Sequence, residues 1–158
     1  MKSKHLLFLC TGNYYRSRFA ELLFNHLAPR HGLSWFAGSR GLALELGAHN
    51  VGPIAADTIA GLAARGISLE GKTRSPLALI EADLVAADHI VALKQAEHFP
   101  LIQHHFPRWV ERVEFWHVHD RDFALPKDTL ADIERNVLEL IGRLEVKEPF
   151  TPAITRAR

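Results

Sequence analysis

The sequence predicts an α/β fold of three layers, in which a four-stranded parallel sheet lies between helices. Two observations carry this prediction. Short apolar runs of strand length alternate with longer segments whose apolar residues recur at the helical period. The first of these runs is continuously apolar, which is typical of a parallel strand that is covered on both faces. Such sheets bind ligands beyond the carboxyl ends of their strands, so a functional site is expected at that edge.

Four segments are predicted to form the strands, at residues 6–9, 34–37, 89–93 and 113–116. Each is a short run of mostly apolar residues. Cys10 follows the first of these segments directly. A side chain in that position lies at the carboxyl edge of a parallel sheet, where the site is expected.

The helices are predicted from apolar periodicity and from residues that end helices. One helix follows the first strand and its loop, and it ends before Pro29, because proline cannot continue a helix. A second covers residues 55–65, and Gly66 just past its end fits a C-terminal cap. The remaining helices are predicted at residues 75–82, at residues 95–104 and from Asp128 onward, the last with the apolar residues Ile133, Val137, Leu140, Ile141 and Leu144.

The chain of 158 residues is long enough for one compact domain, and 47% of its residues are hydrophobic. We expect a single domain over residues 1–147. Residues 148–158 contain two prolines and few apolar anchors, so they are predicted to form a loosely ordered C-terminal tail.

The charge and cysteine content exclude several classes of function. The 19 Lys and Arg residues nearly balance the 18 Asp and Glu residues, and the net charge of +1 gives no large field that would attract nucleic acid or an acidic membrane. The apolar run at residues 6–10 is too short for a signal peptide or a membrane span. The single cysteine excludes an internal disulfide and a multi-cysteine metal site. It fits a reducing compartment, so we expect a cytoplasmic protein that binds neither nucleic acid nor membranes.

One segment between the first strand and the first helix carries the chemistry of this sequence. Successive backbone N–H groups in such a loop can point into one concavity at the N-terminus of a helix, which makes an anion site. Gly12 and Asn13 are residue types that tolerate the left-handed backbone of a tight cradle. The residues predicted to bind phosphate are Thr11, Gly12, Asn13, Tyr14, Tyr15 and Arg16.

Cys10, Arg16 and Ser17 are the candidate catalytic residues of this loop. The N–H dipoles, the helix N-terminus and Arg16 are expected to favour the thiolate of Cys10, which is a competent nucleophile. The planar guanidinium of Arg16 can bind two phosphate oxygens at once. Ser17 can donate a hydrogen bond to the sulfur and help the thiolate depart. The simpler alternative is that Cys10 is a buried cysteine at the end of a strand.

The segment Cys-Thr-Gly-Asn-Tyr-Tyr-Arg-Ser at residues 10–17 resembles the phosphate loop of the low-molecular-weight protein-tyrosine phosphatases, whose pattern is Cys-x-Gly-Asn-x-Cys-Arg-Ser. The similarity runs through most of the chain, although only the loop is strongly specific. The resemblance implies a four-stranded parallel sheet flanked by helices, a phosphocysteine intermediate, and no need for a metal or another cofactor. It also implies a phosphotyrosine side chain of a protein, or a small aryl phosphate, as the substrate.

A carboxylic acid is needed to protonate the leaving group in metal-free phosphoryl transfer. The resemblance implies an Asp of an Asp-Pro pair after the fourth strand, and Asp120 matches that Asp. Arg121 stands where the pattern has proline. A cation beside Asp120 would favour its ionised form unless the Arg121 side chain points away. Asp122 is the alternative acid, and both carboxylates are expected to face solvent.

Two further positions bear on the resemblance. Tyr15 stands where the pattern has a second cysteine, so a disulfide within the loop cannot protect Cys10 from oxidation. Ser39 lies near the place of a family serine that braces the loop asparagine, and the resemblance implies the same contact between Ser39 and Asn13.

Three other functions are alternatives. A metal hydrolase would need ligands at close spacing, and the candidates are His117, His119, Asp120 and Asp122. The loop would also suit arsenate, and an arsenate reductase with a single cysteine would rely on an external thiol. The third alternative is a non-catalytic phosphate-binding module in which Arg121 has disabled the acid. The altered residues after Asp120, which are Arg121, Asp122 and Phe123, also leave open a different phosphomonoester or a phosphoarginine as the substrate.

Overall fold

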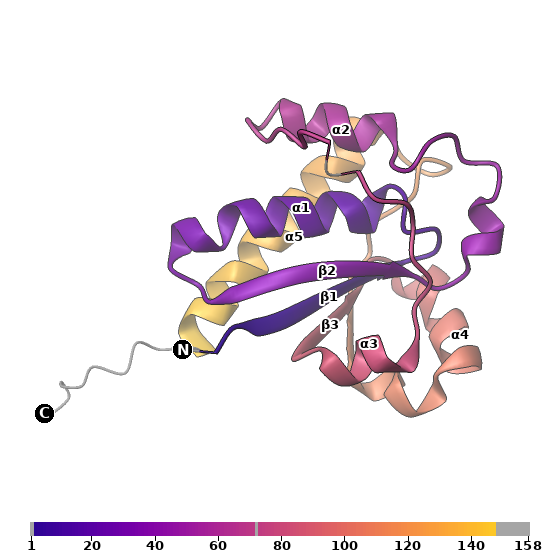
Figure 1. Ribbon diagram of the computed structural model, residues 1–158. Coiled ribbons are helices and arrows are strands. Elements are labelled where there is room, and N and C mark those ends of the chain that lie inside the picture. Colours follow the sequence, from indigo (N-terminus) through magenta and orange to yellow (C-terminus); the bar gives the residue numbers. More distant parts are fainter. Residues whose placement is uncertain (1, 72, 148–158) are drawn as a thin grey trace, which may run out of the picture.

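Four strands form one parallel sheet at the centre of the molecule (Figure 1). The computed structural model describes residues 2–71 and 73–147, and the tail expected at residues 148–158 lies outside the described part. The strands are β1 (Lys4–Cys10), β2 (Trp35–Gly41), β3 (His89–Ala92) and β4 (Val113–Phe115). Their order is β2-β1-β3-β4 and neighbouring strands are parallel, so the predicted fold class is confirmed.

The side chains of β1 alternate between the two faces of the sheet. Leu6, Phe8 and Cys10 belong to the hydrophobic core on one face, whereas Leu7 and Leu9 belong to the core on the other. All five are buried. Burial from both sides explains why this strand is continuously apolar in sequence.

Helices cover both faces of the sheet (Figure 1). On one face lie α1 (Arg16–Leu27), α2 (Ala56–Ala63) and α5 (Pro126–Lys147), and on the other lie α3 (Glu81–Ala86) and α4 (Gln95–His105). Short 3-10 helices occur at Pro29–His31, Leu44–Gly47 and Pro107–Arg112. The predicted apolar stripe of α5 is buried against α1 and the sheet, and its members are Ile133, Val137, Leu140, Ile141 and Leu144.

The ends of two helices follow ordinary capping chemistry. Gly66 lies just past α2 with a φ of 79°, as its position in the sequence predicts. The N–H of Ile67 donates to the carbonyl of Leu62 at 2.9 Å and satisfies an acceptor at this helix end. α5 begins at Pro126 rather than Asp128, because proline is well tolerated in the first turn of a helix.

The helix predicted at residues 75–82 is wrong, since α3 covers Glu81–Ala86 instead. Residues 77–79 are extended beside the end of β2. The N–H of Gly41 donates to the carbonyl of Leu77 at 2.8 Å, and the N–H of Leu79 donates to the carbonyl of Gly41 at 2.9 Å. β2 also continues to Gly41 instead of ending at residue 37, because pairing with β1 along its whole length outweighs the weak strand preference of glycine.

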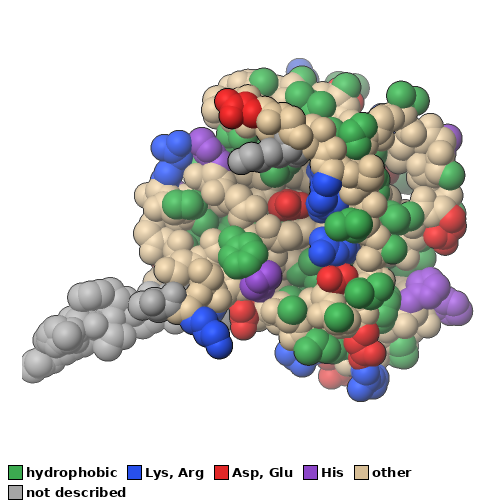
Figure 2. All heavy atoms as spheres, in the orientation of Figure 1, with side chains coloured by type: hydrophobic (Ala, Val, Ile, Leu, Met, Phe, Trp, Pro, Cys, Tyr) green, Lys and Arg blue, Asp and Glu red, His purple; other side chains and the backbone are tan. Residues whose placement is uncertain are grey.

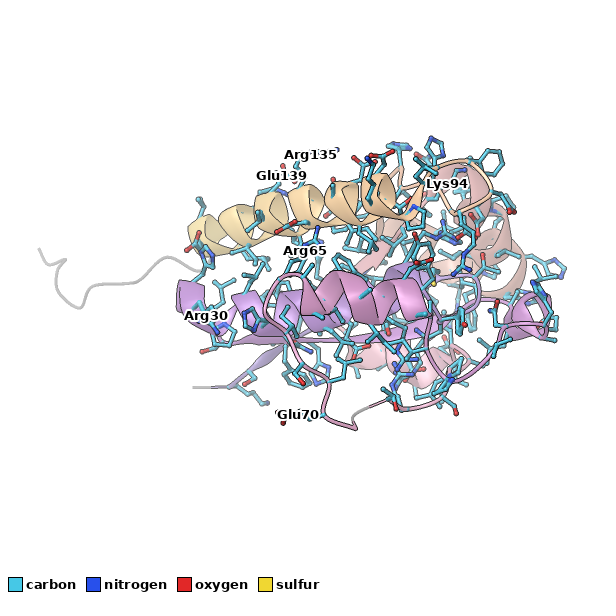
Figure 3. All side chains as sticks on the ribbon, turned by 90° about the horizontal axis from the view of Figure 1, so that it is seen from above. Arg30, Arg65, Glu70, Lys94, Arg135 and Glu139 are labelled. Carbon is cyan, nitrogen blue, oxygen red and sulfur yellow. The ribbon has the colours of Figure 1, made fainter. Side chains whose placement is uncertain are left out.

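Acidic and basic side chains are interspersed on the surface. Figure 2 shows no large patch of one sign on the face in view, in keeping with the net charge of +1. Figure 3 shows Arg65 between α2 and α5, where its Nε donates to Glu134 at 2.9 Å, while Arg135 and Glu139 point outward from α5. Among residues 2–71 and 73–147, none of the helices has the length and apolar content needed to cross a membrane.

Candidate active site

The loop that carries Cys10 joins β1 directly to α1. Among the described residues, no side chain caps the N-terminus of α1, so the N–H groups of its first turn are available to a ligand. Asn13 adopts the left-handed backbone expected of the loop, with a φ of 51°. Gly12 does not adopt a positive φ, so only one of the two predicted left-handed positions is used.

Asn13 holds the loop in shape from beneath. Its side chain is fully buried, and its Nδ2 donates to Ser17 Oγ at 2.9 Å and to Ser39 Oγ at 2.8 Å. Its Oδ1 accepts from Arg74 Nη1 and from the N–H of Leu77, both at 3.0 Å. These four bonds use the whole hydrogen-bonding capacity of the amide. The predicted contact between Ser39 and Asn13 is confirmed.

Cys10 lies at the end of β1 with its Sγ 2.9 Å from Ser17 Oγ. Ser17 Oγ accepts a hydrogen bond from Asn13 Nδ2, and its own hydroxyl hydrogen can be donated to the sulfur. Ser17 is completely buried in the first turn of α1.

Arg16 is buried, and three contacts fix its guanidinium. Nη1 donates to Glu97 Oε1 and to the carbonyl of Val118, both at 3.1 Å, and Nη2 donates to Glu97 Oε2 at 2.8 Å. Asp120 Oδ2 lies 3.4 Å from Nη2. The remaining N–H groups, on Nε and the outer side of Nη2, share one edge of the guanidinium. That edge has the fork geometry that binds two oxygens of a phosphate.

The charges around Arg16 keep it protonated. Burial alone lowers the pKa of Arg16, but its hydrogen bonds to Glu97 and the negative charges of Cys10, Glu97 and Asp120 raise it above its usual value. The Arg16 guanidinium is therefore positively charged at the floor of the site.

Glu97 is a site residue that the sequence analysis missed. It lies in the first turn of α4, after β3, and β3 pairs with β1. Besides binding Arg16, its Oε2 accepts a hydrogen bond from Thr11 Oγ1. Burial raises the pKa of Glu97, but hydrogen bonds from His98, Arg16 and Thr11 and the charge of Arg16 hold it well below the usual range. An acidic residue in the first turn after a strand beside β1 is the signal that could have revealed it.

His98 supports the same corner of the site. Its Nδ1 accepts from the N–H of Lys94 at 3.0 Å, so the proton of the neutral ring is on Nε2, which lies 3.2 Å from Thr11 Oγ1. Burial lowers the pKa of His98, against the effect of its hydrogen bond to Glu97. The neutral imidazole of His98 thus donates a hydrogen bond to Thr11 Oγ1. The Thr11 hydroxyl donates in turn to Glu97, and Glu97 also accepts from Arg16.

Asp120 lies in the loop between β4 and α5, which we call the acid loop (residues 116–125). Its side chain is 36% exposed, and its carbonyl accepts from the N–H of Phe123 at 2.9 Å and of Ala124 at 3.1 Å, which closes a turn. Thr129 Oγ1 of α5 donates to the carbonyl of His119 at 3.1 Å and anchors the start of this turn. Asp122 is exposed. Among the described residues, Asp120 is the acid-loop carboxylate that pairs with Arg16.

One cavity of about 530 Å³ brings these groups together. The phosphate loop contributes Cys10, Thr11, Gly12, Tyr14, Tyr15 and Arg16, and the acid loop contributes Asp120, Arg121 and Asp122. Asn13 and Ser17 lie beneath the floor. The sequence analysis did not anticipate a third wall, formed by Leu46, Gly47, His49, Asn50 and Val51. Tyr14 Oη donates to the carbonyl of Val51 at 2.5 Å and connects this wall to the loop.

The histidines considered as metal ligands do not gather with the site carboxylates. In the part of the chain that the structure describes, no three His, Cys, Asp or Glu side chains are grouped closely enough to hold a metal ion.

The chain is similar to known proteins over most of its length. Residues 5–148 match the family of low molecular weight phosphotyrosine protein phosphatases. A search among curated proteins found no match.

Several solved structures share the fold. The low molecular weight protein tyrosine phosphatase from T. tengcongensis is 24% identical with a TM-score of 0.75, and the match covers 89% of this chain and 99% of that one. YfkJ from Bacillus subtilis is 23% identical with a TM-score of 0.80, covering 94% and 99%. A mutant of YwlE from Bacillus subtilis is 24% identical with a TM-score of 0.74, covering 90% and 99%.

The fold and the family match define a cysteine-dependent phosphatase, a hydrolase of phosphorylated substrates. Because the match spans most of its length, the chain belongs to the low molecular weight phosphotyrosine protein phosphatase family. This membership favours hydrolysis over arsenate reduction and over a non-catalytic phosphate-binding module.

Proposed function

We propose that Cys10 is the nucleophile of a two-step phosphatase reaction. In the first step its sulfur attacks phosphorus, a phosphorus–sulfur bond forms, and the bond from phosphorus to the leaving oxygen breaks. In the second step water attacks the phosphocysteine, the phosphorus–sulfur bond breaks, and inorganic phosphate leaves. Ser17 Oγ, 2.9 Å from the sulfur, donates to the departing thiolate.

Arg16 and the amides of Thr11, Gly12, Asn13, Tyr14 and Tyr15 bind the equatorial oxygens of the phosphoryl group. The edge of the Arg16 guanidinium formed by Nε and Nη2 supplies two donors, and Glu97 and the carbonyl of Val118 fix its orientation. Donors that are held in place before the substrate arrives stabilise the charge of the transition state without reorganising.

Asp120 is the general acid. It protonates the leaving oxygen in the first step and then removes a proton from the attacking water in the second. The observation that carries the proposal is the shared cavity of Cys10, Arg16 and Asp120, in which Asp120 Oδ2 lies 3.4 Å from Arg16 Nη2. Asp122 lines the same cavity and is the alternative acid.

The substrate is a phosphotyrosine side chain of a protein, with small aryl phosphates as surrogates. Family membership supports this class, and the partly exposed Tyr14 ring lines the cavity, where it can contact an aryl group. A chain whose single cysteine is its nucleophile needs a reducing environment, so we place the enzyme in the cytoplasm.

A phosphoarginine side chain is the second candidate substrate. Two carboxylates, Asp120 and Asp122, line the cavity and would attract a guanidinium leaving group. A structural neighbour of 24% identity, the arginine phosphatase YwlE, is described in a mutant form with a phosphorylated active-site serine. Hydrolysis of phosphotyrosine and phosphoarginine peptides, compared by kcat/KM, separates the two.

The test is hydrolysis of para-nitrophenyl phosphate in the presence of EDTA. We expect the parent to turn over, Cys10→Ser to be inactive, and Asp120→Asn to lose a factor of roughly 10²–10⁴. Asp122→Asn is the matched control and is expected to keep most of the activity, because among the described residues the carboxylates paired with Arg16 are those of Glu97 and Asp120.

Three outcomes would contradict the proposal. A larger loss with Asp122→Asn than with Asp120→Asn would move the role of acid to Asp122. Activity that disappears with EDTA would indicate a metal hydrolase. A parent that binds phosphate and turns over no substrate would indicate a binding module.

A further inference from the structure

The phosphate loop and the acid loop contact each other through Tyr15 and Arg121. The guanidinium carbon of Arg121 lies 4.8 Å from the centre of the Tyr15 ring. Tyr15 is only 4% exposed and immediately precedes the buried Arg16, so its ring is a fixed platform. Arg121 is exposed, and this ring provides its contact with the phosphate loop. The geometry is that of a cation–π interaction.

A second contact of the same kind holds the other end of the turn. Lys94 Nζ lies 4.1 Å from the centre of the Phe123 ring. Lys94 precedes α4, the helix that carries Glu97, and Figure 3 shows it beside the chain that leads into α5. The Phe123 ring is 70% exposed and also contacts His119, with ring centres 5.9 Å apart.

Arg121 links these cation–π contacts to the position of the Asp120 side chain. The N–H of Arg121 donates to Asp120 Oδ1 at 2.9 Å, which leaves Oδ2 directed toward Arg16 in the cavity. Proline, which the family pattern has at this position, has no N–H to donate. An arginine here therefore supplies a hydrogen bond that fixes the carboxylate, while its side chain restrains the loop.

We propose that Arg121 and Tyr15, assisted by Lys94 and Phe123, are positioning residues that hold Asp120 over the phosphate loop. This inference rests on the proposed role of Asp120 as the acid. The stack on Tyr15 fixes the Arg121 peptide, and the peptide N–H fixes the Asp120 rotamer. The stack also holds the Arg121 cation on the Tyr15 ring.

The test compares two substrates by kcat/KM, which reports the first chemical step. Phenyl phosphate has a poor leaving group that needs a proton, whereas 2,4-dinitrophenyl phosphate has a good one that does not. For Arg121→Met we expect a loss of about tenfold with phenyl phosphate and of less than about threefold with the activated ester. Arg121→Lys keeps the cation and should retain most of the activity with both.

The partners are tested in the same assay. Tyr15→Phe keeps the ring and should show no selective loss between the two esters, whereas Tyr15→Leu should show the selective loss of Arg121→Met. The double variant Arg121→Met/Tyr15→Leu should lose no more selectivity than either single variant, because the two residues act through one contact. Lys94→Met should give a smaller selective loss, of about two- to threefold.

Asp120→Asn separates the failure of this inference from failure of the proposed function. If Asp120→Asn loses activity equally with both esters, Asp120 is not the acid. That result would contradict both the proposed function of Asp120 and the positioning role of Arg121. If Asp120→Asn loses activity mainly with phenyl phosphate while Arg121→Met behaves as the parent, the positioning role of Arg121 is refuted and Asp120 is still supported as the acid. An equal loss with both esters and a raised KM would identify Arg121 as a residue that binds substrate, which also overturns it.

Discussion

At the scale of single residues, the site depends on how the guanidinium of Arg16 is oriented. Glu97 takes one N–H from each terminal nitrogen, and the carbonyl of Val118 takes another from Nη1. In the proposed mechanism, an arginine held in this way presents the same edge to each phosphoryl group. The carboxylate of Glu97 partly neutralises the positive charge of Arg16. It also fixes the Arg16 side chain before the substrate binds, so less conformational entropy is lost on binding.

Glu97→Gln tests whether orientation outweighs this charge. The variant keeps the size of the side chain, but its amide NH₂ opposes a donor of Arg16, so one of the two charge-assisted bonds is lost. We expect kcat/KM for para-nitrophenyl phosphate to fall by roughly tenfold or more. Glu111→Gln, at an exposed position outside the cavity, is the control. An unchanged or higher kcat/KM would mean that Glu97 mainly competes with phosphate.

At the scale of elements, the end of β2 supports the phosphate loop from the side. A Cβ on Gly41 would lie 2.5 Å from Leu44 Cδ2 and 2.9 Å from the carbonyl oxygen of Thr11. The leucine end can move, but the Thr11 carbonyl belongs to the loop backbone. The absence of a side chain at Gly41 therefore lets the strand approach the loop.

Gly41→Ala is expected to displace the loop backbone and reduce kcat/KM by about 10- to 100-fold, since small displacements of catalytic groups are costly. It should also lower the free energy of unfolding by about 1–3 kcal/mol. Gly38→Ala in the same strand is the matched control, because no atom lies within 4 Å of its added Cβ. Enzyme kinetics and urea unfolding measure both effects, and equal behaviour of the two variants would refute the role given to Gly41.

Some elements of the fold can be predicted from the sequence, and others cannot. The strands predicted at residues 6–9 and 89–93 could be recognised because burial on both faces leaves an apolar run, which in the second strand follows one polar residue, His89. The segment at residues 75–82 was not, because its backbone pairs with Gly41 and with Asn13 Oδ1, which are distant in sequence. Local periodicity carries no information about such partners.

The residues of the candidate site likewise include some that the sequence indicates and some that only the fold brings together. The loop residues from Cys10 to Ser17 are adjacent in sequence, so their residue types, their spacing and the predicted strand and helix on either side mark the loop as a candidate site. Glu97 and Arg74 reach the loop only because the strand order and the bonds to Asn13 bring them there. The contact between Tyr15 and Arg121 joins two positions that the sequence marks as separate departures from the family pattern.

At the scale of the whole molecule, Glu114 ties the edge strand β4 to the rest of the fold. Its carboxylate accepts from His89 Nε2 of β3 at 2.8 Å, from Trp116 Nε1 at 2.7 Å and from both terminal nitrogens of Arg143 of α5 at 2.7 and 3.2 Å. Burial raises the pKa of Glu114, but these bonds outweigh it and hold the pKa well below the usual range.

This shift predicts how stability depends on pH. A carboxyl whose pKa is lower in the folded state binds protons more tightly when the chain is unfolded, so acid favours unfolding. The contribution of Glu114 is complete above its unfolded pKa of about 4.3. It is lost as the pH falls from there toward the lower folded pKa. Glu97, whose pKa is shifted in the same direction, adds to the same loss.

Glu114→Gln is expected to lower the free energy of unfolding at pH 7 by about 1–3 kcal/mol. The difference from the parent should shrink by about 1–2 kcal/mol between pH 7 and pH 3, because protonation weakens the parent there. Urea unfolding followed by tryptophan fluorescence at both pH values measures it. Glu139→Gln is the matched control: Glu139 also pairs with Arg143, but its side chain is 65% exposed and points outward (Figure 3). It should change stability by less than about 0.5 kcal/mol at either pH, and a pH-independent difference for Glu114→Gln would refute the assigned shift.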